Sequence, residues 1–337
     1  MSLKLYFICQ ASNEIGYGHL TRTCNFINKI KDRREVASID LCVISESDNL
    51  DIEKRYNLQP VYFNSEDDII VEKFDLIFLD CVTLGVRFLE LLKSHSRAMI
   101  SLSPVFNNYD YVDYLFTRST YKDTTYTNKV PANIRSGAEF TLLGNELTKT
   151  TAGRYEENLM RKIFSIGICM GATDPLNMTK LILKVISEWK QPCLIWVAVG
   201  DGYKHDVGEL KSIAINDSNH ELVIVSTNDS FWPVFQNSSV LILQGGVTTY
   251  EAAYCGIPSI NIPRSVDHME LTSDLLCREL TWVLDFNKNN YDDLLGLLNK
   301  IYLNKSMLMD MHFRLKHLID DQGPQRVMDD LLSALSN

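Results

Sequence analysis

The first half of the chain alternates short apolar runs with helix-like stretches, which is typical of a parallel β-sheet built from βαβ units. Leu20, Cys24 and Ile27 form an apolar stripe that predicts a helix over Leu20–Ile30, and a second helix is expected at Val86–Leu92. The predicted strands are Leu3–Cys9, Ile39–Ile44, Val61–Phe63, Phe74–Leu79, Ala98–Leu102 and Tyr114–Phe116.

The second half begins the same pattern again after a polar stretch, Leu143–Lys162, where we place the domain boundary. Helices are expected at Leu176–Trp189 and Thr248–Cys255, and Met307–Leu335 is helical in pattern but broken at Gly323 and Pro324. The predicted strands are Ile163–Cys169, Leu194–Val199, Leu222–Val225, Val240–Leu243, Ser259–Ile262 and Trp282–Leu284.

Two similar halves of this kind predict an α/β fold of two Rossmann-like domains that face each other across a cleft. The domains would comprise residues 1–145 and 155–320, and residues 321–337 could form a terminal helix that braces the first domain. The length of 337 residues is more than a single hydrophobic core usually supports, which agrees with two domains.

Charge and cysteine usage narrow the class of protein. The formal net charge of −10 disfavours binding to nucleic acid and to anionic membrane surfaces, but a local pocket can still accept an anionic substrate. No apolar run is long enough to span a membrane, and Met1–Lys4 does not begin a signal peptide. The eight cysteines have no C-x-x-C spacing, so we expect small core residues of a cytoplasmic protein rather than disulfides or metal ligands.

The turn between the first predicted strand and helix carries candidate chemistry. Gly16 and Gly18 let the backbone approach a ligand closely, and the helix N-terminus behind them can hold an anion. His19 lies at the first helical turn, where the dipole favours the neutral imidazole that a general base needs. Arg22 shares a helix face with His19 and could steady a phosphate. A tight turn with a histidine at the helix start is the structural alternative.

Asp80 follows the strand Phe74–Leu79, at the edge of a parallel sheet where ligands bind. Its carboxylate could bind sugar hydroxyls or orient a histidine, and an equally good interpretation is a helix N-cap or a loop residue.

The second domain has two further strand-to-helix turns. In the first, Gly171 and Thr173 could line the cleft, whereas Asp174 followed by Pro175 fits the N-cap and first position of the next helix. In the second, Gly245 and Gly246 precede a helix N-terminus that suits a diphosphate.

Glu251 has two interpretations. Thr248 and Glu251 have the spacing of a capping box, in which each side chain bonds the backbone of the other residue. A functional Glu251 would instead accept hydrogen bonds from ribose hydroxyls. Spacing alone slightly favours the cap.

A later loop, Pro263–Glu270, contains Arg264, Asp267 and His268, which could reach a phosphate or a sugar. The chain has no Asp-x-Asp motif after a strand, no His/Cys cluster with metal spacing, no P-loop and no nucleophile elbow. We therefore expect no metal and no cofactor, and we expect helix termini and cationic side chains to stabilise a diphosphate leaving group.

These residues together resemble a known family. The stretch from Gly16 to Arg22 is similar to the G-x-G-H-x-x-R motif of the UDP-sugar hydrolases of pseudaminic acid biosynthesis and the related spore-coat polysaccharide proteins. Ile168–Asp174 resembles the strand and glycine loop of that family, and Gly245–Glu251 with Gly256–Pro258 resembles its uridine-diphosphate-binding segment. The family belongs to the glycosyltransferase B superfamily, whose members include the enzyme that makes lipid II.

The resemblance implies a hydrolysis with inversion at the anomeric carbon. His19 would act as general base on water, and the nucleoside diphosphate would leave. The glycine loops would lie near the phosphates, and Glu251 would hold the ribose. The substrate would be a nucleotide sugar of bacterial surface-polysaccharide or nonulosonic acid biosynthesis.

Several positions depart from the family pattern on the side of the sugar. Val82 stands where the family has an aromatic residue, Ser101–Ser103 replaces an acidic pair, Val247 replaces a small polar residue, and Asp267 with His268 replaces an Asn-Gln pair. The particular sugar is therefore not implied. A metal-independent inverting glycosyltransferase and a catalytically silent binding subunit are the alternatives, and the retained His19 disfavours the second of these.

Overall fold

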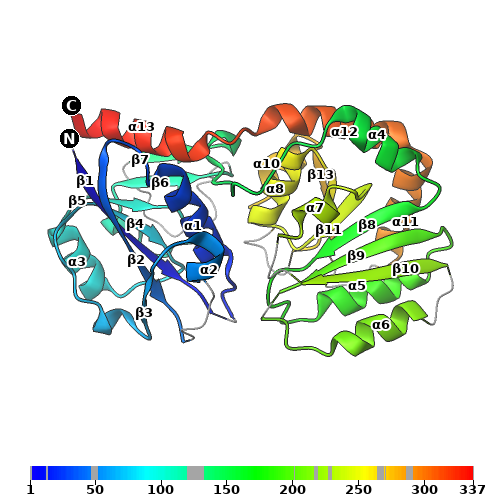
Figure 1. Cartoon of the computed structure of the whole chain (residues 1–337), viewed down its shortest axis with the longest axis horizontal. Coiled ribbons are helices and arrows are strands. Elements are labelled where there is room, and N and C mark those ends of the chain that lie inside the picture. The colour runs from blue at the N-terminus through cyan, green and yellow to red at the C-terminus, as the bar shows by residue number, and fades with distance from the viewer. Residues whose placement is uncertain are drawn as a thin grey trace. The chain divides into compact units, whose positions relative to one another are not determined.

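The computed structural model describes residues 2–12, 14–46, 52–119, 133–200, 202–215, 219–226, 230–263, 269, 271–285 and 291–336. The chain divides into two compact units (Figure 1). The first unit comprises residues 1–145 and 320–337, and the second comprises residues 146–319. Each unit is an α/β domain with a parallel sheet, which confirms the predicted fold class.

The first unit has a seven-stranded sheet in the order β3-β2-β1-β4-β5-β6-β7. All neighbouring strands are parallel. The strands are β1 (Leu3–Gln10), β2 (Val36–Ile44), β3 (Val61–Phe63), β4 (Phe74–Asp80), β5 (Ser96–Ser101), β6 (Tyr114–Thr117) and β7 (Asn133–Ser136), and the helices are α1 (Gly18–Ile30), α2 (Ile52–Tyr56), α3 (Val86–Ser94) and α13 (Gly323–Ser336).

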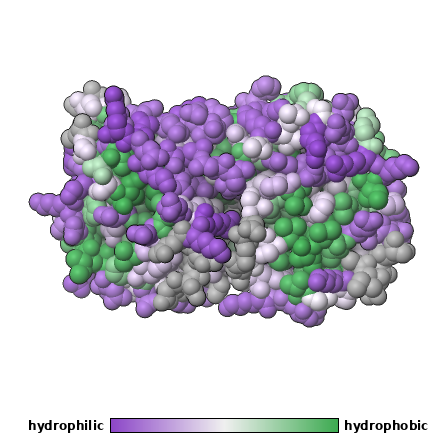
Figure 2. Space-filling view, viewed as in Figure 1, coloured by the Kyte–Doolittle hydropathy of each residue, from purple (hydrophilic) through white to green (hydrophobic). Residues whose placement is uncertain are grey.

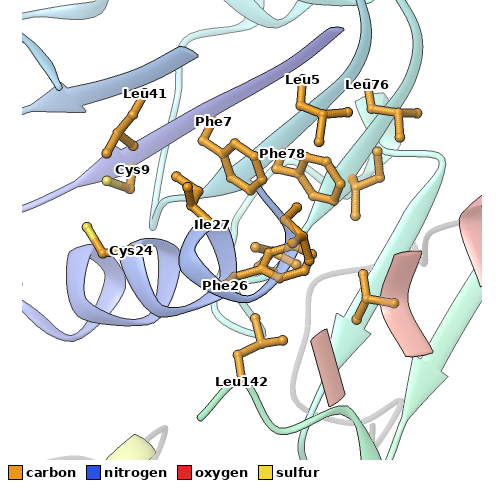
Figure 3. Packing of buried hydrophobic residues seen from close by; sticks show 14 of the residues in the cluster. Leu5, Phe7, Cys9, Cys24, Phe26, Ile27, Leu41, Leu76, Phe78 and Leu142 are labelled. Atoms are coloured by element: carbon orange, nitrogen blue, oxygen red, sulfur yellow. The ribbon is translucent and has the colours of Figure 1, made fainter. Parts of the chain in front are cut away.

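The core between the sheet and α1 is built on aromatic rings. Phe7 of β1 stacks on Phe78 of β4 with ring centroids 4.6 Å apart, and Phe26 of α1 meets both rings edge-on (Figure 3). Offset stacking and edge-to-face contacts are the favourable geometries for such rings. This packing fixes α1, and therefore the turn before it, against the centre of the sheet.

The terminal helix α13 contributes to the same core. Val327, Met328 and Leu331 are fully buried in the cluster that contains Phe7 and Phe26. Gly323 lies so close to the backbone of Thr141 that an added Cβ would be 2.2 Å from its carbonyl oxygen. The first unit is thus completed by a segment from the far end of the chain (Figure 1).

The second unit has a six-stranded parallel sheet in the order β10-β9-β8-β11-β12-β13. The strands are β8 (Phe164–Cys169), β9 (Cys193–Val199), β10 (His220–Ser226), β11 (Val240–Leu243), β12 (Ser259–Asn261) and β13 (Thr281–Val283). The helices are α4 (Ala152–Met160), α5 (Met178–Ser187), α6 (Val207–Ile215), α7 (Trp232–Phe235), α8 (Val247–Cys255), α10 (Ser273–Cys277), α11 (Tyr291–Leu303) and α12 (Lys305–Leu318).

The edge pair β9 and β10 is less covered than the centre of this sheet. Every residue of β8 is buried, whereas Trp196 of β9 is half-buried and Val223, its register partner on β10, is 39% exposed. Figure 2 shows hydrophobic side chains gathered over this part of the unit. The well-packed centre, rather than this edge, positions the loops described below.

Most predicted elements are present with small shifts of their ends. The sequence pattern missed β7 and the helices α2, α4, α6, α7, α10 and α11. The helix α4 lies inside the polar stretch that was predicted to contain the domain boundary. Thr151 caps it, and only one face, with Tyr155 and Leu159, is buried, so the stretch remains polar overall. The eight cysteines are free thiols, of which seven are buried and Cys277 is exposed.

Candidate functional site

The turn after β1 is fixed by two hydrogen bonds to Ser12. Ser12 accepts hydrogen bonds from the N–H groups of Ile15 and Gly16, the first through its hydroxyl at 3.1 Å and the second through its carbonyl at 2.8 Å. Gly16 has φ +89°, a backbone conformation that residues with a side chain rarely adopt. A Cβ added at Gly16 or Gly18 would meet no other described atom within 4 Å, so the space above this turn is open.

His19 lies on the first turn of α1 and is hydrogen-bonded to Asp80, the last residue of β4. Its Nδ1 lies 2.6 Å from Oδ1 of Asp80, and the two side chains are 13% and 1% exposed. An ionised carboxylate can only accept hydrogen bonds, so Nδ1 carries a proton, and in the neutral imidazole Nε2 then has the lone pair. This contact fixes the orientation of the imidazole and places Asp80 beside a histidine, which is one of the arrangements expected for it.

Arg22 contacts the same carboxylate. Its Nε lies 2.7 Å from Oδ2, its Nη2 donates to Oδ1, and Thr23 adds its hydroxyl at 3.3 Å from Oδ2. Burial alone raises the pKa of Asp80, but the charges of Arg22 and His19 and their hydrogen bonds outweigh it and lower that pKa to about 2. Asp80 is therefore a stable anion beneath the imidazole.

The topology of the first sheet explains why these residues meet. The chain goes from β1 outward to β2 on one side, and β4 pairs with β1 on the other side, so the strand order reverses between β1 and β4. Ligands of open α/β sheets bind at such switch points, beyond the carboxyl ends of the strands. Cys9 is the register partner of Asp80, so both strands end at the same level.

Gln10, which sequence reasoning missed, secures the loop after β4. Its Oε1 accepts a hydrogen bond from the N–H of Val82 at 2.8 Å, and its Nε2 donates to the carbonyl of Thr83 at 2.8 Å. A polar residue at the carboxyl end of a strand, where the apolar run stops, is the only signal in the sequence that could have suggested it.

The second unit has a corresponding switch point between β8 and β11. Gly171 follows β8 with φ +87°, and an added Cβ there would lie 2.6 Å from Oε1 of Gln244, which follows β11. Gly245 and Gly246 come next, with φ +104° and +78°. The structure therefore brings Gly171 and the Gln244–Gly246 loop together, whereas Gln244 itself was missed.

Helix α8 begins directly after these glycines. It starts at Val247 with Gly246 as N-cap, so Thr248 occupies the second helical position and the predicted capping box is wrong. Two glycines with positive φ bring the chain into the helix two residues earlier than the Thr-x-x-Glu spacing indicates. Glu251 is a buried residue of α8, and Thr249, also missed, donates to Oδ1 of Asn261 at 2.6 Å.

The predicted N-cap role of Asp174 needs a correction. Helix α5 begins at Met178, with Asn177 as N-cap in the left-handed conformation. The carboxylate of Asp174 reaches forward to accept the N–H groups of Met178 at 2.8 Å and Thr179 at 2.9 Å. It therefore satisfies helix N–H groups from outside the helix, as a side chain does when its own backbone stays in a turn.

The loop after β9 supports this turn. Tyr203 donates its hydroxyl proton to Oδ1 of Asn177 at 2.8 Å, and Nε2 of His205 donates to the carbonyl of Asp174 at 2.9 Å. Thr173 is buried within the turn that these contacts support.

Two predicted residues, Asp267 and His268, lie outside the described residues, as does Arg264. Ser101 and Ser103, which replace an acidic pair of the resembling family, are buried, and the Ser101 hydroxyl donates to the Ser103 carbonyl at 3.0 Å. Within the described ranges, no group of three or more His, Cys, Asp or Glu residues is arranged to hold a metal ion.

Comparison with known proteins gives relatives of low identity. No protein-family model matches the chain. It is 21% identical over 312 residues to the uncharacterized protein MJ1062 of Methanocaldococcus jannaschii, covering 90% of this chain and 60% of that protein. It is 24% identical over 260 residues to the UDP-2,4-diacetamido-2,4,6-trideoxy-beta-L-altropyranose hydrolase of Campylobacter jejuni, covering 74% of this chain and 88% of that enzyme.

Solved structures match along the whole chain. Acinetobacter baumannii MurG has a TM-score of 0.65 at 12% identity, with 98% of this chain and 99% of that chain covered. Anabaena HepE in complex with UDP has a TM-score of 0.62 at 10% identity, with 98% and 100% covered.

The names of the similar proteins include a UDP-sugar hydrolase, glycosyltransferases and a putative UDP-N-acetylglucosamine 2-epimerase, and several of the structures contain UDP or UDP-glucose. Within the parts of the chain that the structure describes, no helix has both the length and the apolar character needed to cross a membrane. Identities of 10–12% carry the fold alone, and that fold, two Rossmann-like domains as in MurG, is the glycosyltransferase B fold.

Proposed function

We propose that this protein is a nucleotide-sugar hydrolase that acts on a UDP-sugar, with His19 as its general base. The observation that carries the proposal is the hydrogen bond between His19 and Asp80, which holds Nδ1 protonated and leaves Nε2 available above an open glycine turn. The 24% identity to a UDP-sugar hydrolase supports the same reaction class.

In the proposed reaction, Nε2 of His19 accepts a proton from a water molecule as the water oxygen bonds to the anomeric carbon. The bond between that carbon and the diphosphate oxygen breaks, and its electron pair leaves with UDP. Asp80 stabilises the imidazolium that forms, because it is already an anion at neutral pH. The products are the free sugar, with inverted configuration, and UDP.

The second unit would bind the nucleotide. Gly245 and Gly246 carry no side chains at the carboxyl edge of the sheet, so a diphosphate can approach the backbone there, and Gly171 lets the amide of Gln244 pack beside it. Thr173 and Thr248 would lie near the phosphates, and Glu251 would accept the ribose hydroxyls.

On the sugar side, we propose that Gly16 and Gly18 admit the substrate and that Asp267 and His268 contact the sugar or its phosphate. The substrate would belong to bacterial surface-polysaccharide or nonulosonic acid biosynthesis. Because several residues on the sugar side differ from the resembling family, the individual sugar has to be identified by assay.

A glycosyltransferase is the second candidate, favoured by the match to MurG and to the calicheamicin glycosyltransferase CalG4. The base would then deprotonate a hydroxyl of an acceptor sugar rather than water. Both reactions use His19 in the same way, so the acceptor is what distinguishes them.

The test is incubation of the whole protein with UDP-, CMP- and GDP-sugars, including the substrate of the Campylobacter enzyme, while nucleotide and free sugar are measured. We expect UDP release without acceptor, reduced about 10²- to 10⁴-fold in His19→Gln. The matched control is His95→Gln, which changes a half-buried histidine at the C-cap of α3 in the same unit.

If UDP is released only after a sugar acceptor is added, the protein is a glycosyltransferase and not a hydrolase. Binding of UDP-sugars without turnover, with or without acceptor, would exclude both enzyme functions.

A further inference from the structure

We propose that Arg22 is a positioning residue that acts on His19 through Asp80 and is not a ligand of the substrate phosphate. This inference rests on the proposed function and assigns the arginine of the Gly16–Arg22 turn a different role from the phosphate contact that its sequence position suggests.

The contacts of Arg22 are directed inward. Its side chain is 6% exposed, and it grips Asp80 with Nε on Oδ2 and Nη2 on Oδ1. A two-point grip of this kind fixes the plane of the carboxylate as well as its position. The plane matters here because Oδ1 is also the oxygen that accepts the proton of His19 Nδ1.

The positive charge of Arg22 also keeps the buried Asp80 ionised. Asp80 is 1% exposed, and an isolated carboxylate at such a place would be costly and would become protonated. A protonated Asp80 would no longer require Nδ1 to be the donor, and the imidazole could turn or change tautomer. Arg22 keeps the carboxylate ionised in the one orientation that presents Nε2 outward.

Nη2 of Arg22 lies 3.3 Å from His19 Nδ1, and both atoms carry protons in this arrangement. They are therefore two donors that share one acceptor, Oδ1, rather than partners of each other. Lysine could supply the charge but not the two-point geometry, because its ammonium group is a point charge. The substitutions Arg22→Lys and Arg22→Gln separate these two contributions.

The experiment measures imidazole geometry, nucleotide binding and turnover separately in both variants. The state of His19 is followed in the whole protein labelled with ¹⁵N-histidine, where a Nδ1 proton bound to a carboxylate gives a low-field resonance, assigned with His19→Gln. Binding of UDP is measured by calorimetry. The control is Arg87→Gln, an exposed arginine on α3 of the same unit.

We expect the low-field resonance to weaken in Arg22→Lys and to disappear in Arg22→Gln. Turnover number should fall about 10-fold and about 10²-fold, respectively, while KM and the dissociation constant of UDP stay within about twofold. Arg22→Lys, which keeps the buried charge, carries the test if Arg22→Gln does not fold.

A tenfold or larger loss of UDP affinity with an unchanged His19 resonance would overturn the proposal and make Arg22 a phosphate ligand. An unchanged resonance with unchanged turnover would overturn it too. If the wild type turns over no nucleotide sugar, the proposed function fails, but the resonance still decides whether Arg22 orients His19.

Discussion

Single residues at the carboxyl edges of the two sheets show how backbone conformation and side-chain contact act together. Gly171 has φ +87°, and the amide of Gln244 fills the place where its Cβ would be. The glycine thus serves two purposes, a left-handed turn and a close approach of two loops. Asp80 differs from Gly171, because its ionised state depends on the side chains of Arg22 and His19 that contact it.

Gly171→Ala should lower both stability and nucleotide affinity. The left-handed conformation costs an L-residue about 1–2 kcal/mol, and the added methyl group also displaces the flexible amide of Gln244. The double variant Gly171→Ala with Gln244→Ala should regain the steric part and keep the conformational part. Urea unfolding and UDP calorimetry on both variants measure the two parts.

Gly153→Ala is the matched control, since Gly153 lies in α4 and an added Cβ meets no other described atom within 4 Å. It should leave stability unchanged or raise it by about 0.5–1 kcal/mol. A Gly171→Ala variant as stable as the wild type would contradict the argument for this glycine.

At the scale of elements, helix α8 is fastened at both ends by residues distant in sequence. Near its start, Thr249 bonds Asn261 of β12, and at its C-cap the carbonyl of Gly256 accepts a hydrogen bond from His312 of α12 at 2.5 Å. His312 is fully buried and stacks on Tyr155 of α4 with centroids 4.5 Å apart. The helix that carries Glu251 is thereby held by both its neighbours.

Because His312 is buried in this contact with Gly256, we expect the folded protein to lose stability in acid. Burial lowers the pKa of His312 below 6.5; the hydrogen bond to Gly256 opposes the shift, and the charge of Lys316 adds to it. The folded state therefore binds fewer protons than the unfolded state, so its stability is fully present above pH 6.5 and falls as the pH decreases below that value. Protonation would also place a proton on Nε2, which is buried without a hydrogen-bond acceptor among the described residues.

His312→Asn keeps a donor near Gly256 and removes the titrating group. Urea unfolding at pH 7.5 and 5.5 should show a smaller decrease of stability in this variant than in the wild type. His317→Asn, an exposed position on the same helix, should retain the wild-type decrease. Equal slopes for His312→Asn and the wild type would show that another group is responsible.

At the scale of the whole molecule, the first unit depends on the last helix of the chain. Helix α13 places Val327, Met328 and Leu331 in its core and adds ion pairs from Arg33 to Asp329 and from Arg135 to Asp330. The ion pairs are partly exposed at the surface and contribute little, so the burial of apolar side chains provides most of the stabilisation. A unit that is discontinuous in sequence can form only after the entire chain has been made.

Removal of residues 320–337 should unfold the first unit. Three buried side chains contribute about 1.5–3 kcal/mol each, and their sum is comparable to the stability of a typical domain. Met328→Ala should cost about 2–5 kcal/mol, whereas Leu303→Ala, at a side chain exposed to 82%, should cost little. Calorimetric scans should show one transition lost or lowered on truncation, and a truncated protein with the native thermogram would refute this dependence.

The sequence by itself determined most of the strands, several of the helices, the fold class and the places where glycine turns meet helix starts. These follow from local periodicity and from residues such as Gly16 and Gly245, whose conformational freedom needs no partner. The exact first residue of a helix could not be predicted from the sequence, as the helices that follow Asp174 and Gly246 show. Side-chain bonds and glycine dihedrals decided these starts, and spacing alone does not encode them.

Only the tertiary structure decided which of these residues meet. His19 and Asp80 are 61 positions apart, and they touch because β1 and β4 pair in a register that sets Cys9 opposite Asp80. That register is a property of two packed strands and one helix, to which rings such as Phe7, Phe26 and Phe78 contribute. The inward grip of Arg22 on Asp80 has the same origin, and no motif in the sequence distinguishes it from a phosphate contact.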